Sequence, residues 1–268
     1  MGILLHRMEL SIIQIREANM GYKSISIKKA LTYLNNPIEQ GGFWIPNVQR
    51  EFIWKEEQIE QFFNLIMKEY PIGLFLILKT KKQVKYRRFV STYSEGVNTI
   101  SSAEPITDTQ KLLILDGQQR FQSLFIALNG SYNGKELYFD VLSGRETNKD
   151  GIKYKFKFIK EREADAYWVK VKDVVNSDCR SNVTRRHVIS EIKRKINEEM
   201  TEEIKTIIDD NLDQLINCFV NKKAICYNIL DNVEHNGLYT NEDICEIVSK
   251  SNLSDGLVKK DELMMVLE

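Results

Sequence analysis

A short run of apolar residues, Leu112-Leu113-Ile114-Leu115, ends at Asp116-Gly117 and passes directly into a segment with helical apolar spacing. A run this short and this apolar is typical of a buried strand. The following segment, 118–128, repeats its apolar residues every three or four positions, and Asn129-Gly130 ends it. A buried strand that turns at once into an amphipathic helix requires a sheet with helices packed on it, so the segment predicts a mixed α and β fold.

The rest of the chain supports an α+β fold with a mixed N-terminal half and a helical C-terminal half. Helical spacing covers residues 24–36, 54–70, 188–221, 241–250 and 259–267, and strand patterns cover 43–46, 73–78, 137–139, 154–159, 168–171 and 224–230. We expect two domains, 1–183 as an α+β phosphate-binding domain and 184–268 as a mainly helical extension, with packing of both as one unit as the alternative.

The two clearest amphipathic segments, 54–70 and 118–128, each present one apolar face. Nothing else nearby is apolar enough to cover these faces, so we expect them to share one core with the strand at 112–115. The residues expected to be buried there are Trp54, Phe62, Phe63, Ile66, Ile114, Leu124 and Phe125.

The turn at residues 116–120 has the features of a phosphate site. The first turn of a helix offers backbone N–H groups, Gly117 allows close approach, and Arg120 adds a cation. Gln118 and Gln119 stand beside these donors, and Asp116 could hold a metal ion or a ribose hydroxyl. The alternative is structural: Asp116 caps the helix and Arg120 pairs with it.

A second polar pair, Gln49-Arg50, stands between apolar positions just before a predicted helix. Phe52 and Trp54 would anchor this loop in the core and fix the position of the pair. The planar guanidinium of an arginine suits two-point contact with phosphate. A surface salt bridge of Arg50 is the alternative.

Charge is unevenly distributed although the whole chain is neutral. Residues 145–195 carry 15 Lys and Arg against 8 Asp and Glu, whereas residues 196–268 carry 6 against 16. The basic part could face an anionic partner, or the two parts could neutralise each other within one fold. The strip 79–88 holds six basic residues, which indicates either a nucleic-acid contact or a solvated edge.

Several function classes find no support in the sequence. The four cysteines and three histidines have no zinc-site spacing. No apolar stretch approaches the ~20 residues of a membrane span, and the N-terminus lacks the features of a signal peptide, so we expect a cytoplasmic protein. The segment 130–136 is a poor phosphate-binding loop, because it is one residue short and has Glu136 where Ser or Thr is needed.

Two segments together resemble the N-terminal domain family of GmrSD-type, modification-dependent restriction systems. They are IPNVQREFIWKEEQIEQFFNLIMKEYPIGLFLI at residues 45–77 and LILDGQQRFQSLFIALNG at 113–130. A third, weaker segment at 246–263 is like a family segment that precedes a helix. The family also occurs in phage-defence proteins and is related to ParB and sulfiredoxin. Phe121-Gln122 departs from the family's usual Leu-Thr, and we expect this change to leave the site intact.

The resemblance implies a ParB- and sulfiredoxin-like α+β nucleus with a helical extension, and binding or Mg²⁺-dependent hydrolysis of an NTP coupled to recognition of DNA. By position, Gln49 and Arg50 match one family motif and residues 116–120 the other. Asp116 would be the catalytic residue or the Mg²⁺ ligand. Since no nuclease module follows residue 268, we expect a fragment or a sensor half. The alternatives are a non-catalytic module that binds the DNA backbone and a protein-interaction half.

Overall fold

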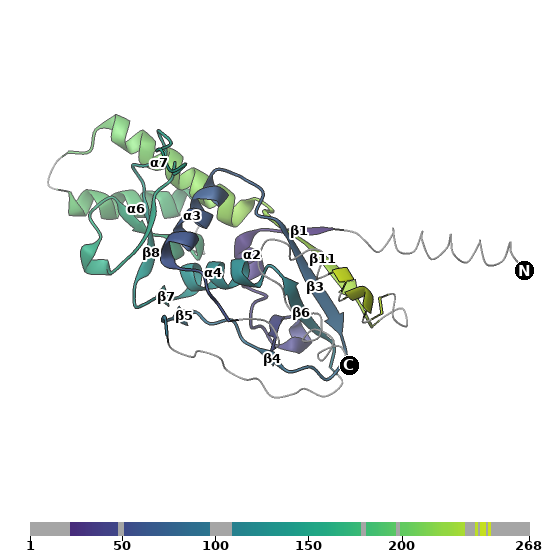
Figure 1. The fold of residues 1–268 in the computed structure, drawn as a ribbon. Coiled ribbons are helices and arrows are strands. Elements are labelled where there is room, and N and C mark those ends of the chain that lie inside the picture. The colour runs from purple at the N-terminus through teal and green to yellow at the C-terminus, as the bar shows by residue number, and fades with distance from the viewer. Residues whose placement is uncertain are drawn as a thin grey trace, which may run out of the picture.

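The computed structural model describes residues 22–47, 51–96, 109–177, 181–196, 199–233, 239–240, 242–244 and 246–247, and it has the expected α+β fold (Figure 1). A six-stranded sheet has the order β1-β11-β3-β6-β2-β4. Its strands are β1 (Lys23–Ile25), β2 (Phe43–Pro46), β3 (Leu74–Thr80), β4 (Tyr86–Arg87), β6 (Lys111–Asp116) and β11 (Ile225–Asp231). Kinship with ParB and sulfiredoxin stays a prediction.

Two strands that lead into the predicted site motifs, β2 and β6, are parallel neighbours in this sheet. Phe43 pairs with Leu112 and Trp44 with Leu113. Because parallel strands end at the same edge of a sheet, the loop after β2 and the turn after β6 leave the sheet on the same side. The topology therefore brings the segment that follows β2 and the turn that follows β6 to one edge of the sheet, while Gln49 and Arg50 lie outside the described residues.

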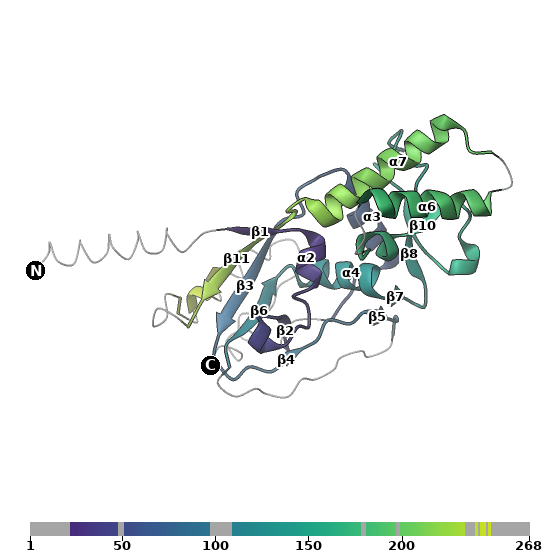
Figure 2. The same ribbon diagram turned by 180° about the vertical axis from the view of Figure 1, so that it is seen from behind.

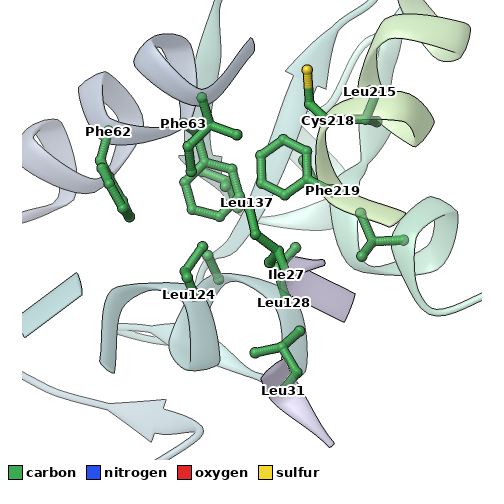
Figure 3. Packing of buried hydrophobic residues seen from close by; sticks show 14 of the residues in the cluster. Ile27, Leu31, Phe62, Phe63, Leu124, Leu128, Leu137, Leu215, Cys218 and Phe219 are labelled. Carbon is green, nitrogen blue, oxygen red and sulfur yellow. The ribbon is translucent and has the colours of Figure 1, made fainter. Parts of the chain in front are cut away.

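The main core lies between this sheet and the helices α2 (Ile27–Leu31), α3 (Glu56–Met67) and α4 (Gln118–Asn129). Figure 3 shows Phe62 and Phe63 of α3 facing Leu124 of α4. Five of the seven expected core residues are fully buried here, while Trp54 and Phe125 are partly buried against the same core. A smaller apolar cluster, which includes Trp44, Leu76 and Tyr86, covers the opposite face of the sheet.

The second half of the described chain adds a smaller sheet and further helices, which lie together beyond α2 and α4 (Figures 1 and 2). The sheet has the order β10-β8-β9. Its strands are β8 (Glu136–Asp140), β9 (Phe156–Ile159) and β10 (Trp168–Lys170); the helices are α5 (Val171–Val175), α6 (Ser181–Lys195) and α7 (Glu202–Ile216). The minor elements are β5 (Thr92–Tyr93), β7 (Ser131–Tyr132), the 3-10 turns η1 (Ile38–Gln40) and η2 (Glu161–Glu163), and the π-helical turn η3 (Asn217–Asn221).

Two helix predictions need correction. The segment 188–221 is not one helix, because Thr201 starts α7 as its N-cap, with its side chain accepting from the N–H of Ile204. The segment 24–36 holds β1 followed by the short α2, whose N-cap is Ser26. Both errors have one cause: helical apolar spacing continues across a capping serine or threonine, so periodicity alone misses the boundary.

The expected boundary between residues 183 and 184 stays a prediction, with one relevant structural fact. Strand β11, which comes from the predicted extension, lies between β1 and β3 in the six-stranded sheet. It is antiparallel to β1 and parallel to β3. The expected helices at 241–250 and 259–267 lie mostly or wholly outside the described residues, and helical turns at 242–244 and 246–247 are described.

Candidate functional site

The turn from β6 into α4 is fixed by a carboxylate and a glycine. Asp116 Oδ1 accepts a hydrogen bond from the Gly117 N–H at 2.8 Å. Gly117 has φ +88°, and a Cβ there would lie 2.2 Å from Cδ1 of Phe75. Both the backbone angle and the close contact demand glycine, so the chain can turn here directly beneath the aromatic ring.

Arg120 lies in the first turn of α4, and its guanidinium is hydrogen-bonded to backbone carbonyls at the start of β3. Nη1 donates to the carbonyl of Ile72 at 2.6 Å, and Nη2 donates to that of Leu74 at 3.1 Å. Nη2 also pairs with Asp116 Oδ2 at 3.4 Å, and the guanidinium lies 4.5 Å from the centre of the Phe75 ring. The structural alternative had two parts. Arg120 does pair with Asp116, but the N-cap of α4 is Gly117 and not Asp116.

Gly73 makes room for this guanidinium, which the sequence reading did not anticipate. Its φ is +84°, and a Cβ at this position would lie 2.3 Å from Nη1 of Arg120. The glycine lies within the family segment 45–77, in Pro71-Ile72-Gly73. A glycine immediately before a buried strand signals close approach of another group, and this signal could have identified the contact.

Gln119, in the motif at residues 116–120, contacts the loop that directly follows the Gln49-Arg50 motif. Its Oε1 accepts from the N–H of Ile53 at 3.0 Å, and its Nε2 donates to the carbonyl of Glu51 at 3.0 Å. The amide thus pairs with the loop as a neighbouring strand would, across more than sixty positions of sequence. Gln119 is 3% exposed. Gln49 and Arg50 lie outside the described residues, but Glu51, their neighbour in the chain, is held against α4.

Two tyrosines hold the other carbonyls of the same loop, which we call the 51–54 loop. The Tyr93 hydroxyl donates to Phe52 at 3.3 Å. The Tyr132 hydroxyl has two acceptors, the Trp54 carbonyl at 3.2 Å and a carboxylate oxygen of Glu95 at 2.7 Å. Burial and then Glu95 raise the pKa of Tyr132, so its hydroxyl keeps the proton that it donates. Side chains from three other segments therefore fix this loop.

Three further polar side chains of α4 are buried. Gln118 is 8% exposed. Gln122 accepts from the Val90 N–H at 3.2 Å and donates to the Val90 carbonyl at 2.6 Å. Ser123 donates to the carbonyl of Gln119 at 2.8 Å. Gln122, one of the two departures from the family motif, thus gives α4 a second loop contact, and the expectation that this change leaves the site intact stays a prediction.

The basic strip 79–88 does not form one exposed cationic surface. Lys79 is half-buried in an ion pair with Asp231 at 2.8 Å, and Arg87 is buried. Arg88, the residue after β4, is exposed, and its guanidinium lies 5.6 Å from the centre of the Trp44 ring. Lys81, Lys85 and Arg88 are exposed, so contact of these residues with a nucleic acid stays a prediction.

Two features of the described residues concern metal binding and membrane insertion. Within them no cluster of three or more His, Cys, Asp or Glu side chains is arranged to hold a metal ion. A magnesium ion at this turn would therefore depend on Asp116 together with oxygens of a bound nucleotide and water, which is how proteins commonly bind magnesium. No helix among these residues is long and apolar enough to cross a membrane.

Comparison with known proteins gives two findings. The sequence model of a family described as "GmrSD restriction endonuclease, N-terminal domain" matches residues 31–258, which include every residue of the site described above. A segment of 89 residues is 30% identical to the uncharacterized protein MJ0686 of Methanocaldococcus jannaschii. That segment is 33% of this chain and 15% of the relative, so the chain matches only a small part of that protein's length.

Proposed function

The chain belongs to the family of GmrSD restriction endonuclease N-terminal domains, and from this premise we propose that the turn between β6 and α4 binds the phosphates of a nucleoside triphosphate. Strands β2 and β6 end together at one edge of the sheet, which supports a site that combines the two motifs. Helix N-terminal N–H groups and arginines are the groups that proteins use for such anions. Gln49, Arg50, Gly117, Gln118 and Arg120 are the proposed contacts.

The observation that carries the proposal is the pairing of Gln119 with the 51–54 loop. A phosphate site built from distant segments needs a contact that keeps them in register, because a displacement of about 1 Å removes much of the benefit of positioning. Gln119 supplies this contact at 3.0 Å on both sides of its amide. It therefore acts on the ligand through the loop rather than by direct contact.

Arg120 is held mainly by backbone carbonyls, which do not neutralise its charge. Two hydrogen bonds of its guanidinium go to backbone carbonyls, and a third, longer one goes to Asp116 at 3.4 Å. An anchored guanidinium loses little side-chain freedom when a phosphate arrives. Its five N–H donors exceed these three contacts, which leaves capacity for a ligand.

Asp116 is the proposed catalytic group. A carboxylate does not attract phosphate, so its use lies in orienting and deprotonating a water molecule or in holding the Mg²⁺ that accompanies the nucleotide. When bound, that ion would neutralise charge on the phosphates. Asp116 is nearly buried, and Arg120 stands beside it. In a restriction or defence protein, hydrolysis here would be coupled to recognition of DNA, with cleavage assigned to a nuclease domain.

The test uses calorimetric titration with a non-hydrolysable NTP, phosphate-release assays and melting curves. Asp116→Asn retains an oxygen for the Gly117 N–H and loses the charge, so we expect turnover to be abolished while binding remains. Arg120→Gln should weaken binding by about 1.5–3 kcal/mol, or tenfold to a hundredfold. Gln61→Ala, an exposed change on α3, is the control.

The possible outcomes distinguish the proposal from its two alternatives. If the parent protein binds none of the four NTPs with or without Mg²⁺, the proposal is wrong. If Arg120→Gln lowers the melting temperature but leaves NTP affinity unchanged, the structural alternative holds. Duplex DNA in place of the nucleotide tests the non-catalytic alternative, which requires DNA binding that depends on Arg120 and no turnover of NTP.

A further inference from the structure

Helix α6 carries a strong positive charge, and its neighbour α7 carries an equally strong negative one. Helix α6 has five Lys and Arg against one acidic residue, and α7 has five Asp and Glu against one lysine. The two helices pack on each other, in the group of elements that lies beyond α2 and α4 (Figures 1 and 2). Their contacts therefore show how far the basic part of the chain, 145–195, and the acidic part, 196–268, neutralise each other.

Ion pairs take up more of the acidic charge of α7 than of the basic charge of α6. Asp213 of α7 pairs with Arg185 of α6 at 2.6 Å, and Glu203 of α7 pairs with Arg145 at 2.8 Å. A third acidic residue of α7 pairs with the lysine of the same helix. Three of the five acidic residues of α7 thus have a basic partner, and Arg185 is the one residue of α6 that pairs with α7 within the described part of the chain.

The other basic residues of α6 are less neutralised. Arg186 donates to the backbone carbonyl of Asn182 at 3.2 Å, and neither Arg186 nor Lys193 has an acidic partner among the residues that the structure describes. Arg194 pairs with Glu191 of the same helix, but both side chains of this pair are exposed. Solvent screens such a pair, so it holds Arg194 only weakly.

Helical geometry gathers these residues on one side of α6. Val188 and Ile192 are buried in the main core, whereas Arg186, Lys193 and Arg194 are exposed. At 3.6 residues per turn the three cations project from the side opposite the two buried residues. Arg186 and Lys193 are two turns apart, which is about 10 Å along the helix axis. We call Arg186, Lys193 and Arg194 the basic face of α6.

The basic face offers charge rather than apolar surface to a partner. Val183 is the one large hydrophobic residue that is exposed among the described residues of α6. A stable protein interface needs an apolar centre, and exposed ion pairs alone contribute only about 0–1 kcal/mol each. A nucleic-acid backbone needs no apolar centre, because neutralisation of its phosphates releases counterions.

The number and spacing of the cations also fit a nucleic-acid backbone. Over about 10 Å of its axis, one strand of duplex DNA presents about three phosphates, at about 3.4 Å each. The chain as a whole has no net charge. Attraction of a polyanion therefore requires a local concentration of positive charge, which the basic face supplies.

We infer that the basic face of α6 binds the phosphodiester backbone of a nucleic acid, as a second surface apart from the turn between β6 and α4. Arg186 and Lys193 supply cations without an acidic partner in the described chain, and Arg194 exchanges Glu191 for a phosphate. Backbone contacts carry no sequence information, so the face binds without regard to base sequence. The competing account is that the basic face meets the acidic α7 of a second copy of this chain.

The first experiment measures fluorescence anisotropy of a short labelled DNA duplex, and of an RNA duplex of the same sequence, over a series of salt concentrations. The triple variant Arg186→Gln, Lys193→Gln, Arg194→Gln should reduce the slope of log affinity against log salt by about 2–3 and lower the affinity at low salt about tenfold or more. Its melting temperature should stay within about two degrees of the parent, because all three side chains are exposed.

A matched control removes the same charge from another element. Lys155, Lys157 and Lys160 are exposed residues in and beside β9. Replacement of all three by Gln should leave the salt slope within about 0.5 of the parent. Equal losses in the two triple variants would show a general attraction of the basic part of the chain and would overturn the inference, as would a parent protein that binds neither duplex.

The competing account is tested by sedimentation of the same proteins and of one variant in α7. Asp209→Asn with Asp210→Asn removes acidic charge, so affinity for the duplexes should stay the same or rise up to about threefold, with no change in oligomeric state. An interface between two copies requires instead a parent dimer that both this variant and the α6 variant dissociate. That result, together with no binding of either duplex, rejects the inference.

The inference goes beyond the proposed function, and the two can fail separately. The α6 variant should keep the NTP affinity of the parent, and Arg120→Gln should keep its affinity for the duplexes. If Arg120→Gln weakens duplex binding and the α6 variant does not, the backbone is bound at the turn after β6 and the inference is wrong. Loss of NTP binding alone leaves the basic face of α6 unaffected.

Discussion

Helices α4 and α7 bury different kinds of side chain. The buried face of α7 is apolar except for Asn211, which donates to the carbonyls of Val141 and Ser143 at 2.7 Å each. Helix α4 buries Gln118, Gln119, Gln122 and Ser123 besides its apolar residues. An ordinary amphipathic helix contributes mainly packing. Helix α4 therefore has a second role, because the side-chain amides of its glutamines hold irregular segments that pair with no strand.

The largest effect should be the same in both helices, because their apolar residues have the same task. Leu124 of α4 and Leu212 of α7 are both fully buried. We expect Leu124→Ala and Leu212→Ala each to lower the free energy of unfolding by about 2–5 kcal/mol, measured by chemical denaturation. A loss below about 1 kcal/mol in one of them would show that its helix is not part of the core.

The next effect should concern the one buried amide of α7. Asn211→Leu keeps the branching of the side chain but leaves two carbonyls in the interior without their donor, since Val141 and Ser143 are both buried. Unsatisfied groups of this kind should lower the free energy of unfolding by about 1–3 kcal/mol. Binding of NTP by the folded protein should stay as in the parent, which calorimetry and denaturation together can establish.

A smaller loss of stability is expected for the corresponding change in α4. Glu51 and Ile53 are exposed, so water can replace the amide in Gln119→Met, and the loss should be about 0.5–1.5 kcal/mol. The 51–54 loop should then move away from the turn, with loss of NTP affinity or turnover. If Gln119→Met and Asn211→Leu affect stability and NTP binding alike, the contrast between the two helices does not hold.

The smallest effect should come from exposed ion pairs. Arg145 and Glu203 pair at 2.8 Å at the start of α7, and their side chains are 57% and 76% exposed. Water and salt screen such a pair, and the ordering of two long side chains opposes it. Arg145→Gln should therefore leave the melting temperature within about one degree of the parent, at low and high salt alike.

Sequence reasoning predicted the elements of the site but not its contacts. The strand, turn and helix at residues 111–129 follow from local apolar spacing and a glycine, which a single segment displays. The partners of Gln119, Gln122 and Arg120 come from residues that are 32 to 68 positions distant. Such contacts depend on the order of the strands in the sheet, which local apolar spacing does not give.

The position of β11 has a consequence for how the molecule is made. Strand β1 near the N-terminus can join the sheet only after residues 225–231 have been synthesised, because β11 lies between it and β3. A chain emerging from the ribosome therefore carries β3 with an open edge for most of its synthesis. Such an edge is a template for pairing with other chains, and closure over so long a separation is slow. Truncation before residue 225 should accordingly yield aggregation rather than a smaller folded domain.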